Sequence, residues 1–307
     1  MTRQERLHLL AEQKFLRERL AELPQGAQIM RISTESRLRS IEETLTQAPA
    51  DQVEPAKVRL TFNGRPVIRN HGVFAEFGMN ATKAFADCVA LIAASLTGPL
   101  SATGPIPNRD QNQLLITSTA VGSFGFELEE YVGEQLELLE EETPLARALE
   151  VAQALLQSTQ GTDDDLADSA AATDPRAIAA VRGFLETLAS NEAVCALEYR
   201  GKTFRFSDVG AVRRGLARMG QDNLREEEQV LEGEFRGALP KSRRFEFQPA
   251  ETDEILGGKV GPAIEDVDEL NERLHQPARI TVMVTRVGSG RPRYVLLAPP
   301  EWVDGGS

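Results

Sequence analysis

Residues 58–68 read VRLTFNGRPVI, and residues 196–206 read ALEYRGKTFRF. Each stretch alternates apolar with polar residues on both sides of a glycine-containing turn, Asn63-Gly64 in the first and Arg200-Gly201 in the second. Such alternation is typical of half-buried strands, and Asn-Gly favours a two-residue hairpin turn because both positions need positive φ. We therefore predict a β-hairpin in each stretch.

Each predicted hairpin is followed by a helix and two more strands. The order strand, strand, helix, strand, strand thus occurs twice, and the sequence predicts a duplicated ββαββ unit. Because hairpins dominate and β-α-β crossovers do not, we expect an α+β fold with antiparallel sheets. The predicted helix and later strands are 81–96, 114–120 and 124–129 in the first unit, and 209–219, 229–235 and 244–247 in the second.

Composition and turn signals divide the chain into four expected parts. Capping residues directly before prolines, as in Thr143-Pro144 and Asp174-Pro175, indicate helix starts between the two units. Short strands at regular spacing near the C-terminus favour a small β-barrel of SH3 or OB size, with an open sheet as the alternative. The parts are an N-terminal helical hairpin or coiled coil with its linker (1–52), the first ββαββ unit (53–132), an alanine-rich helical connector (133–192), and the second unit extended into the barrel-like segment (193–307).

Apolar residues recur at helical spacing in residues 1–48, which carry eight Arg or Lys and seven Glu. A helix pair this small needs a further surface to be stable. It either folds back on its own domain or attaches the chain to a protein partner, including a second copy. The candidate partner-binding residues are Leu7, Leu10, Leu16, Leu20, Leu38, Ile41 and Leu45.

The charge and the composition limit the classes of protein to which this chain can belong. The net charge is −13, and residues 127–142 hold eight glutamates and no basic residue. The average field of this acidic protein repels nucleic acid and anionic membranes. The absence of an apolar run of about 18 residues predicts no membrane span. Two cysteines in apolar surroundings and the excess of arginine over lysine indicate a bacterial cytoplasmic protein.

No set of catalytic or metal-ligating residues is visible in the sequence. The carboxylates of Asp163–Asp165 are best explained as helix-capping residues, and Gly257-Gly258-Lys259 lacks the Ser/Thr and the helix of a phosphate-binding loop. The two cysteines have no activating neighbour. We therefore expect no metal, no cofactor and no catalytic residue, and the three histidines have no metal-ligand spacing: His8, His71 and His275.

Basic residues flank the C-terminal hairpins, with Phe245, Phe247 and Tyr294 between them. Loop arginines beside strand aromatics bind single-stranded nucleic acid by charge and stacking. The alternative is that the aromatic residues form the core and the basic residues are solvated. The candidate nucleic-acid-binding residues are Lys241, Arg243, Arg244, Arg286, Arg291 and Arg293.

Three functional hypotheses follow. The leading one is a non-enzymatic interaction protein, an accessory or regulatory subunit that docks or self-associates through its N-terminal helices. The second is a nucleic-acid-binding protein that uses the C-terminal β segment. The third is an enzyme whose site forms only in the folded chain.

Overall fold

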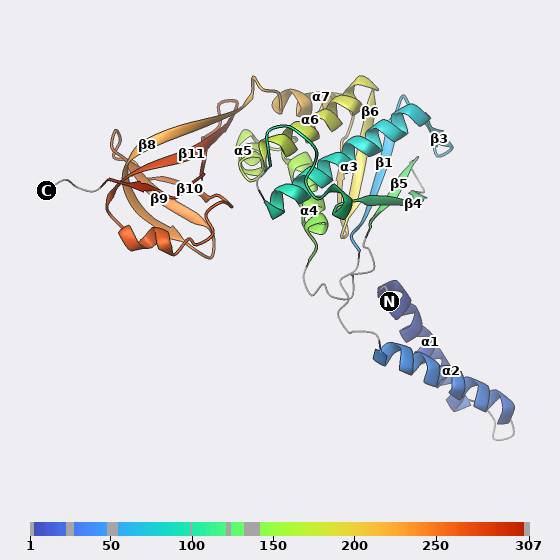
Figure 1. The fold of residues 1–307 in the computed structure, drawn as a ribbon. Coiled ribbons are helices and arrows are strands. Elements are labelled where there is room, and N and C mark those ends of the chain that lie inside the picture. Colours follow the sequence, from blue (N-terminus) through green and yellow to red (C-terminus); the bar gives the residue numbers. More distant parts are fainter. Residues whose placement is uncertain are drawn as a thin grey trace. The chain divides into compact units, whose positions relative to one another are not determined.

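The fold is α+β, as the sequence predicts, and its contacts divide the chain into two compact units (Figure 1). One unit contains the helices α1 (Arg3–Glu22) and α2 (Gln28–Gln47), and the other contains the remaining described helices and strands. Most of the expected linker and most of the glutamate-rich run lie outside the described residues. This computed structural model describes residues 3–22, 28–47, 55–98, 100–120, 124–131 and 142–303.

A five-stranded antiparallel sheet lies at the centre of the larger unit. Its strand order is β4-β5-β1-β6-β7, so β1 lies in the middle and β4 and β7 form the two edges. The strands are β1 (Lys57–Gly64), β4 (Leu114–Ala120), β5 (Phe124–Glu130), β6 (Ala193–Tyr199) and β7 (Lys202–Arg205).

Helices cover one face of this sheet (Figure 1). Val58, Leu60 and Phe62 alternate along β1 and are fully buried against the helical layer, whereas Lys57 and Arg59 point to the other face. One face of the sheet is therefore core and the other carries charges. The helices described in this part of the chain are α3 (Ala75–Thr97), α4 (Pro144–Ser158), α5 (Asp163–Ala170), α6 (Pro175–Ser190) and α7 (Val209–Arg218), with a short 3-10 helix η1 (Arg109–Gln111); α5 packs against α4 and β11.

Helix α3 is long and apolar enough to cross a membrane by length and composition alone. However, 56% of its apolar window is buried in the structure. Phe85, Cys88 and Ile92 lie in the core, where α3 packs against α4 and α6. This burial is that of a core helix, for which the same composition is expected.

The predicted connector helices begin where their capping residues indicate. Asp174 caps α6, with Pro175 in the first turn, and α4 begins at Pro144. Thr162 caps α5 in a reciprocal capping box, in which Asp165 accepts from the backbone N–H of Thr162 at 2.8 Å. The aspartate run therefore begins a helix, as predicted.

The first predicted hairpin is wrong, and the second is right. Strand β1 runs on through Gly64, which pairs with Ala193 on β6. A Cβ at Gly64 would lie 2.3 Å from the carbonyl oxygen of Glu192, so the glycine permits a close backbone approach. At Arg200-Gly201, φ is +48° and +74°, and the turn joins the paired strands β6 and β7. The positive φ values that define a two-residue hairpin turn occur here.

The order of elements recurs in both predicted units, but the pairing does not. In the first unit, β2 (Val67–Ile68) pairs with β3 (Gly72–Val73), while β1 joins β5 and β6. In the second unit, the two strands after α7 leave the central sheet. The similarity lies in local pattern, because strand partners are chosen by tertiary contacts.

Those strands belong to a closed five-stranded C-terminal barrel, as the sequence predicts. Its order is β8-β9-β10-β12-β11, and β11 pairs back with β8, while β10 and β12 are parallel. With a short helix between the third and fourth strands, this is the order of an OB-fold. The elements are β8 (Leu224–Leu239), β9 (Arg244–Pro249), β10 (Leu256–Val260), the 3-10 helix η3 (Glu269–Arg273), β11 (Pro277–Val287), β12 (Arg293–Leu296) and, at the beginning of β11, β13 (Glu301–Trp302).

Candidate interaction sites

The β8–β9 turn holds three of the six predicted nucleic-acid-binding residues. Lys241 and Arg244 are exposed. Arg243, in contrast, donates to the carbonyl oxygens of Gly261 at 2.8 Å and Ile264 at 2.6 Å. The guanidinium of Arg243 therefore holds the loop after β10 in place, and two cations of the turn remain on the surface.

The other three predicted residues lie around the β11–β12 turn. Arg293 forms ion pairs with Asp168 at 2.5 Å and Asp164 at 3.2 Å on α5. The backbone N–H of Arg291 donates to Asp164 at 3.3 Å. Arg286 is exposed on β11. The basic side chain of Arg293 thus binds a helix of its own chain, and the turn is fixed to α5.

Lys259, which was not among the predicted nucleic-acid-binding residues, lies next to the exposed cations of the β8–β9 turn. Lys259 on β10 lies directly opposite Arg244 on β9, and both side chains are exposed. Neither forms a hydrogen bond or ion pair with any residue that the structure describes. Fifteen residues separate them, so only the strand register reveals the pair.

The strand aromatics lie in the barrel core. Phe245 and Phe247 are fully buried, together with Phe235, and Tyr294 packs against the same cluster. Alternation along β9 places Arg244 and Glu246 on the outer face. The outer face of β9 and β10 therefore carries charge, and no aromatic side chain of either strand is available there for stacking.

The predicted partner-binding residues form the seam of the helical hairpin where the structure describes them. Ile41 is 1% exposed, and Leu16 and Leu38 are half-buried. Leu20 and Leu45 are also half-buried, while the side chains of Leu7 and Leu10 fall outside the described set. These residues mainly hold α1 and α2 together.

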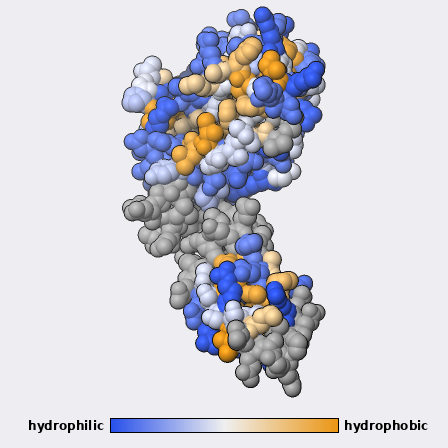
Figure 2. Space-filling model, turned by 90° about the vertical axis from the view of Figure 1, so that its right-hand side faces the viewer, coloured by the Kyte–Doolittle hydropathy of each residue, from blue (hydrophilic) through white to orange (hydrophobic). Residues whose placement is uncertain are grey.

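A different set of apolar side chains faces outward from the hairpin. Phe15 is 56% exposed, Met30 50% and Ile32 66%. Apolar atoms are visible on this unit in Figure 2. Met30 and Ile32 follow no simple heptad spacing with the buried residues, so the periodicity of the sequence does not reveal them.

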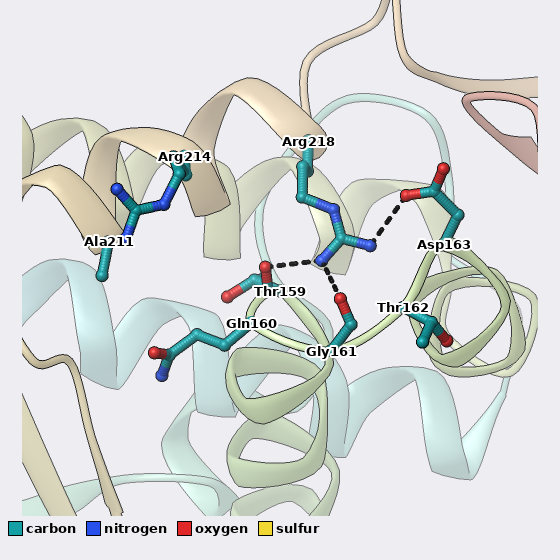
Figure 3. Close-up of a pocket in the computed structure, with 8 residues that line it drawn as sticks. All are labelled: Thr159, Gln160, Gly161, Thr162, Asp163, Ala211, Arg214 and Arg218. Carbon is teal, nitrogen blue, oxygen red and sulfur yellow. Dashed lines mark hydrogen bonds and ion pairs between the residues drawn. The ribbon is translucent and has the colours of Figure 1, made fainter.

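A pocket of about 340 Å³ lies where α4 ends and α5 begins (Figure 3). Arg218 of α7 donates to the carbonyl oxygens of Thr159 at 2.7 Å and Gly161 at 2.8 Å, and it pairs with Asp163 at 2.9 Å. The guanidinium of Arg214 points away from this cluster in Figure 3. Arg218 satisfies carbonyl groups at the end of α4, which is a structural role.

A larger hollow of about 710 Å³ on the barrel contains His275. The Nδ1 atom of His275 lies 3.0 Å from Glu234 and 2.9 Å from Arg236, and Arg236 also pairs with Glu234 at 2.8 Å. The charges of Glu234 and Arg236 thus neutralise each other. Within the described part of the chain, no group of three or more His, Cys, Asp or Glu residues could hold a metal ion.

Neither cysteine is suited to nucleophilic chemistry. Cys88 and Cys195 are buried and unpaired in the core of the larger unit. Burial raises the pKa of each thiol to about 12. Both thiols are therefore protonated at neutral pH and serve as small apolar core groups.

Comparison with protein-family models, with curated proteins and with solved structures finds no match to this chain.

Proposed function

We propose that this chain is a non-enzymatic interaction protein, an accessory or regulatory subunit of the bacterial cytosol, that attaches to another protein chain through α1 and α2. The carrying observation is the outward display of Phe15, Met30 and Ile32 on a unit that buries little of its own surface. Among the described side chains of these two helices, only Thr34 and Ile41 are buried.

Among the side chains described for the helical hairpin, few contacts stabilise it internally. Arg37 forms a two-pronged ion pair with Glu12 at 2.9 and 3.0 Å, and Arg17 pairs with Glu42 at 2.8 Å. Exposed pairs of this kind are screened by solvent and contribute little to stability. Helix pairs gain most of their stability from packing of an apolar face. A partner that covers Phe15, Met30 and Ile32 would supply this packing.

The charge balance favours a second copy of the hairpin as that partner. Residues 1–48 carry eight basic and seven acidic side chains, so two copies approach without net repulsion. Residues 1–48 thus have a net charge of +1, and the rest of the chain carries −14, which together give the total of −13. If two chains associate through their hairpins as a short coiled coil, their acidic larger units do not need to contact each other.

Light scattering after size-exclusion chromatography tests this proposal. A chain shortened to begin at residue 53 keeps both described hydrophobic cores of the larger unit, because they contain no residue before Ala56. We expect the full chain to have the mass of two copies and the shortened chain the mass of one. Equal monomeric masses, with equal unfolding midpoints, would show that the helices do not self-associate.

A second candidate function is binding of single-stranded nucleic acid by the barrel. The specific observation in its favour is the Arg244–Lys259 pair, with Lys241 in the adjacent turn, on strands two and three of an OB-type barrel. That face and the first turn are where OB-folds bind oligonucleotides. Without stacking residues, this binding would depend on charge and would weaken steeply with salt.

A further inference from the structure

We propose that the edge strand β4 is a docking site for an extended, basic segment of a partner protein, which adds to the central sheet as a sixth strand. This inference rests on the proposed role of the chain as a binding protein. It concerns a different surface from the helical hairpin, and it names the chemistry of the segment that binds there.

Strand β4 is an open sheet edge with an apolar surface. It lies at the end of the strand order and pairs only with β5 among the described strands. Its sequence, LLITSTA, has no charge, proline or glycine. Leu115 is 44% exposed and Ile116 60% exposed. Figure 2, which looks toward the side of this unit that carries β3 and β4, shows apolar atoms on its surface.

The opposite edge of the same sheet is protected, whereas β4 is not. Strand β7 is four residues long, and its end residues Lys202 and Arg205 are exposed charges. Short, charged edges prevent pairing with other chains. On β4 the single protective feature is a bulge between Ile116 and Ser118. An uncharged edge of this length, with a bulge as its only described protection, can still serve as a template for β-strand addition.

The charges beside β4 indicate which segment it accepts. On the open face, Glu198, Arg59, Glu127 and Ser118 lie in register across four strands, so the charge alternates and ends in an uncharged serine. Arg59 lies 3.8 Å from Glu198, and Lys57 on β1 lies 3.6 Å from Glu127, so Glu127 already has one cation beside it on the side away from β4. Strands are about 4.8 Å apart, so a lysine on an added strand would lie about 10 Å from β5 and could reach the Glu127 carboxylate.

A second carboxylate reinforces this preference. Glu129 on β5 lies opposite Leu115, on the same face, and it has no hydrogen-bond or ion-pair partner among the residues described. An incoming strand with Lys or Arg at alternate positions would place its basic side chains over Glu127 and Glu129. Its other side chains would lie beside Ile116, which favours aliphatic or β-branched residues there.

The same charges argue against a second copy at this edge. Two β4 strands paired together would bring two acidic β5 strands into one sheet, from chains that each carry a net charge of −13. Like charges at this separation repel, so electrostatics would weaken the binding of a second copy and strengthen the binding of a basic partner. The occupant we infer is therefore a basic segment of a different protein.

Three synthetic peptides of about ten residues test the inference on the full chain. One alternates lysine with valine, the second alternates glutamate with valine, and the third is the lysine peptide with alternate backbone amides methylated. Binding is followed by fluorescence anisotropy, and the site by hydrogen exchange. We expect the lysine peptide to protect residues 114–120 and to bind about tenfold more tightly than either of the others.

Matched variants locate the site. Ser118→Lys should weaken the lysine peptide about tenfold, and Glu129→Gln should weaken it severalfold, whereas Glu198→Gln on the far side of Arg59 should leave affinity unchanged. Equal binding of the three peptides, protection outside 114–120, or doubling of the mass through β4 would overturn the inference. Measuring peptide binding to the Ile32→Glu variant separates the docking proposal from the proposed self-association. The variant should no longer associate through its hairpin, but it should still bind the lysine peptide.

Discussion

Arg244 and Lys259 face each other directly across the antiparallel strands β9 and β10, and both are exposed. Like charges in this arrangement destabilise a sheet. The pair occurs in a chain with a net charge of −13, where acidic partners are abundant. The pair costs stability and lies on the face where OB-folds bind oligonucleotides, so it is the candidate site of the proposed nucleic-acid binding.

Replacing one member of the pair should separate stability from binding. Lys259→Glu places opposite charges across the strands, so the free energy of unfolding should rise by about 0.2–1 kcal/mol. The same change should weaken binding of a single-stranded oligonucleotide about tenfold at roughly 50 mM salt in a gel-shift assay. Lys202→Glu, at the exposed edge of the central sheet, is the control and should leave oligonucleotide binding unchanged.

Failure of the unaltered chain to bind at low salt would remove the nucleic-acid hypothesis. Arg243→Glu is unsuitable as a test, because Arg243 holds the carbonyl groups of Gly261 and Ile264 and its loss would disturb the loop itself.

Two adjacent glycines in β10 should respond very differently to alanine. A Cβ at Gly258 would lie 2.4 Å from a ring carbon of Phe245 and 2.6 Å from the carbonyl oxygen of Tyr294. At Gly257 the nearest atom is 3.9 Å away. Gly258→Ala should therefore destabilise the chain by about 1–3 kcal/mol in urea unfolding. Gly257→Ala should change it by less than about 0.5 kcal/mol, and equal effects would contradict the inward placement of Gly258.

Arg218 and Arg214 on α7 provide a second matched pair. Arg218→Met removes the hydrogen bonds to Thr159 and Gly161 and the ion pair with Asp163, so we expect a loss of about 2–3 kcal/mol of unfolding free energy. Arg214→Met removes no hydrogen bond or ion pair to a described residue, and should cost less than about 0.5 kcal/mol. If both variants unfold at the same denaturant concentration, Arg218 does not hold the end of α4.

Glu226 should make stability depend on pH near neutrality. Burial, reinforced by the nearby charge of Asp174 and opposed by Arg182, raises the pKa of the Glu226 carboxyl from 4.5 to about 7. A carboxyl with a raised pKa holds its proton more tightly in the folded chain, so its contribution to stability falls as pH rises from 4.5 to about 7.

Glu226→Gln should remove this dependence. In thermal unfolding, the variant should be more stable than the original chain above pH 7 and differ little from it well below pH 4.5, where the original carboxyl is protonated in both states. Glu228→Gln, an exposed position on the same strand, should follow the original curve. A Glu226 variant with an unchanged pH profile would contradict the burial of this carboxyl.

Local patterns predicted the parts of the fold that local chemistry determines. The caps before α5 and α6, the Arg200-Gly201 turn and the small C-terminal barrel all follow from residue type and alternation. The Asn63-Gly64 prediction failed because a glycine needed for close approach to Glu192 has the same local signature as a hairpin turn. Strand partners chosen over long distances in the chain are not encoded in such signals.

The candidate sites were less predictable for the same reason. The basic cluster near residue 241 was visible, but Arg243 and Arg293 proved to bind carbonyl groups and carboxylates of their own chain. Only the strand register, which places Lys259 opposite Arg244, shows that Lys259 belongs to the candidate site. Likewise, the apolar spacing of α1 and α2 identified residues of their internal seam, whereas exposure identified Phe15, Met30 and Ile32.

The mass of the Ile32→Glu variant in solution, measured by light scattering, tests most directly whether the hairpin joins two chains. Ile32 is 66% exposed, so a charge there should not unfold the helix but should prevent an apolar contact. We expect two copies for the original chain and for the control Ser40→Glu, an exposed position about two turns further along α2 than Ile32, and one copy for Ile32→Glu. An original chain that is monomeric, or an Ile32→Glu variant that stays paired, would contradict the proposed function.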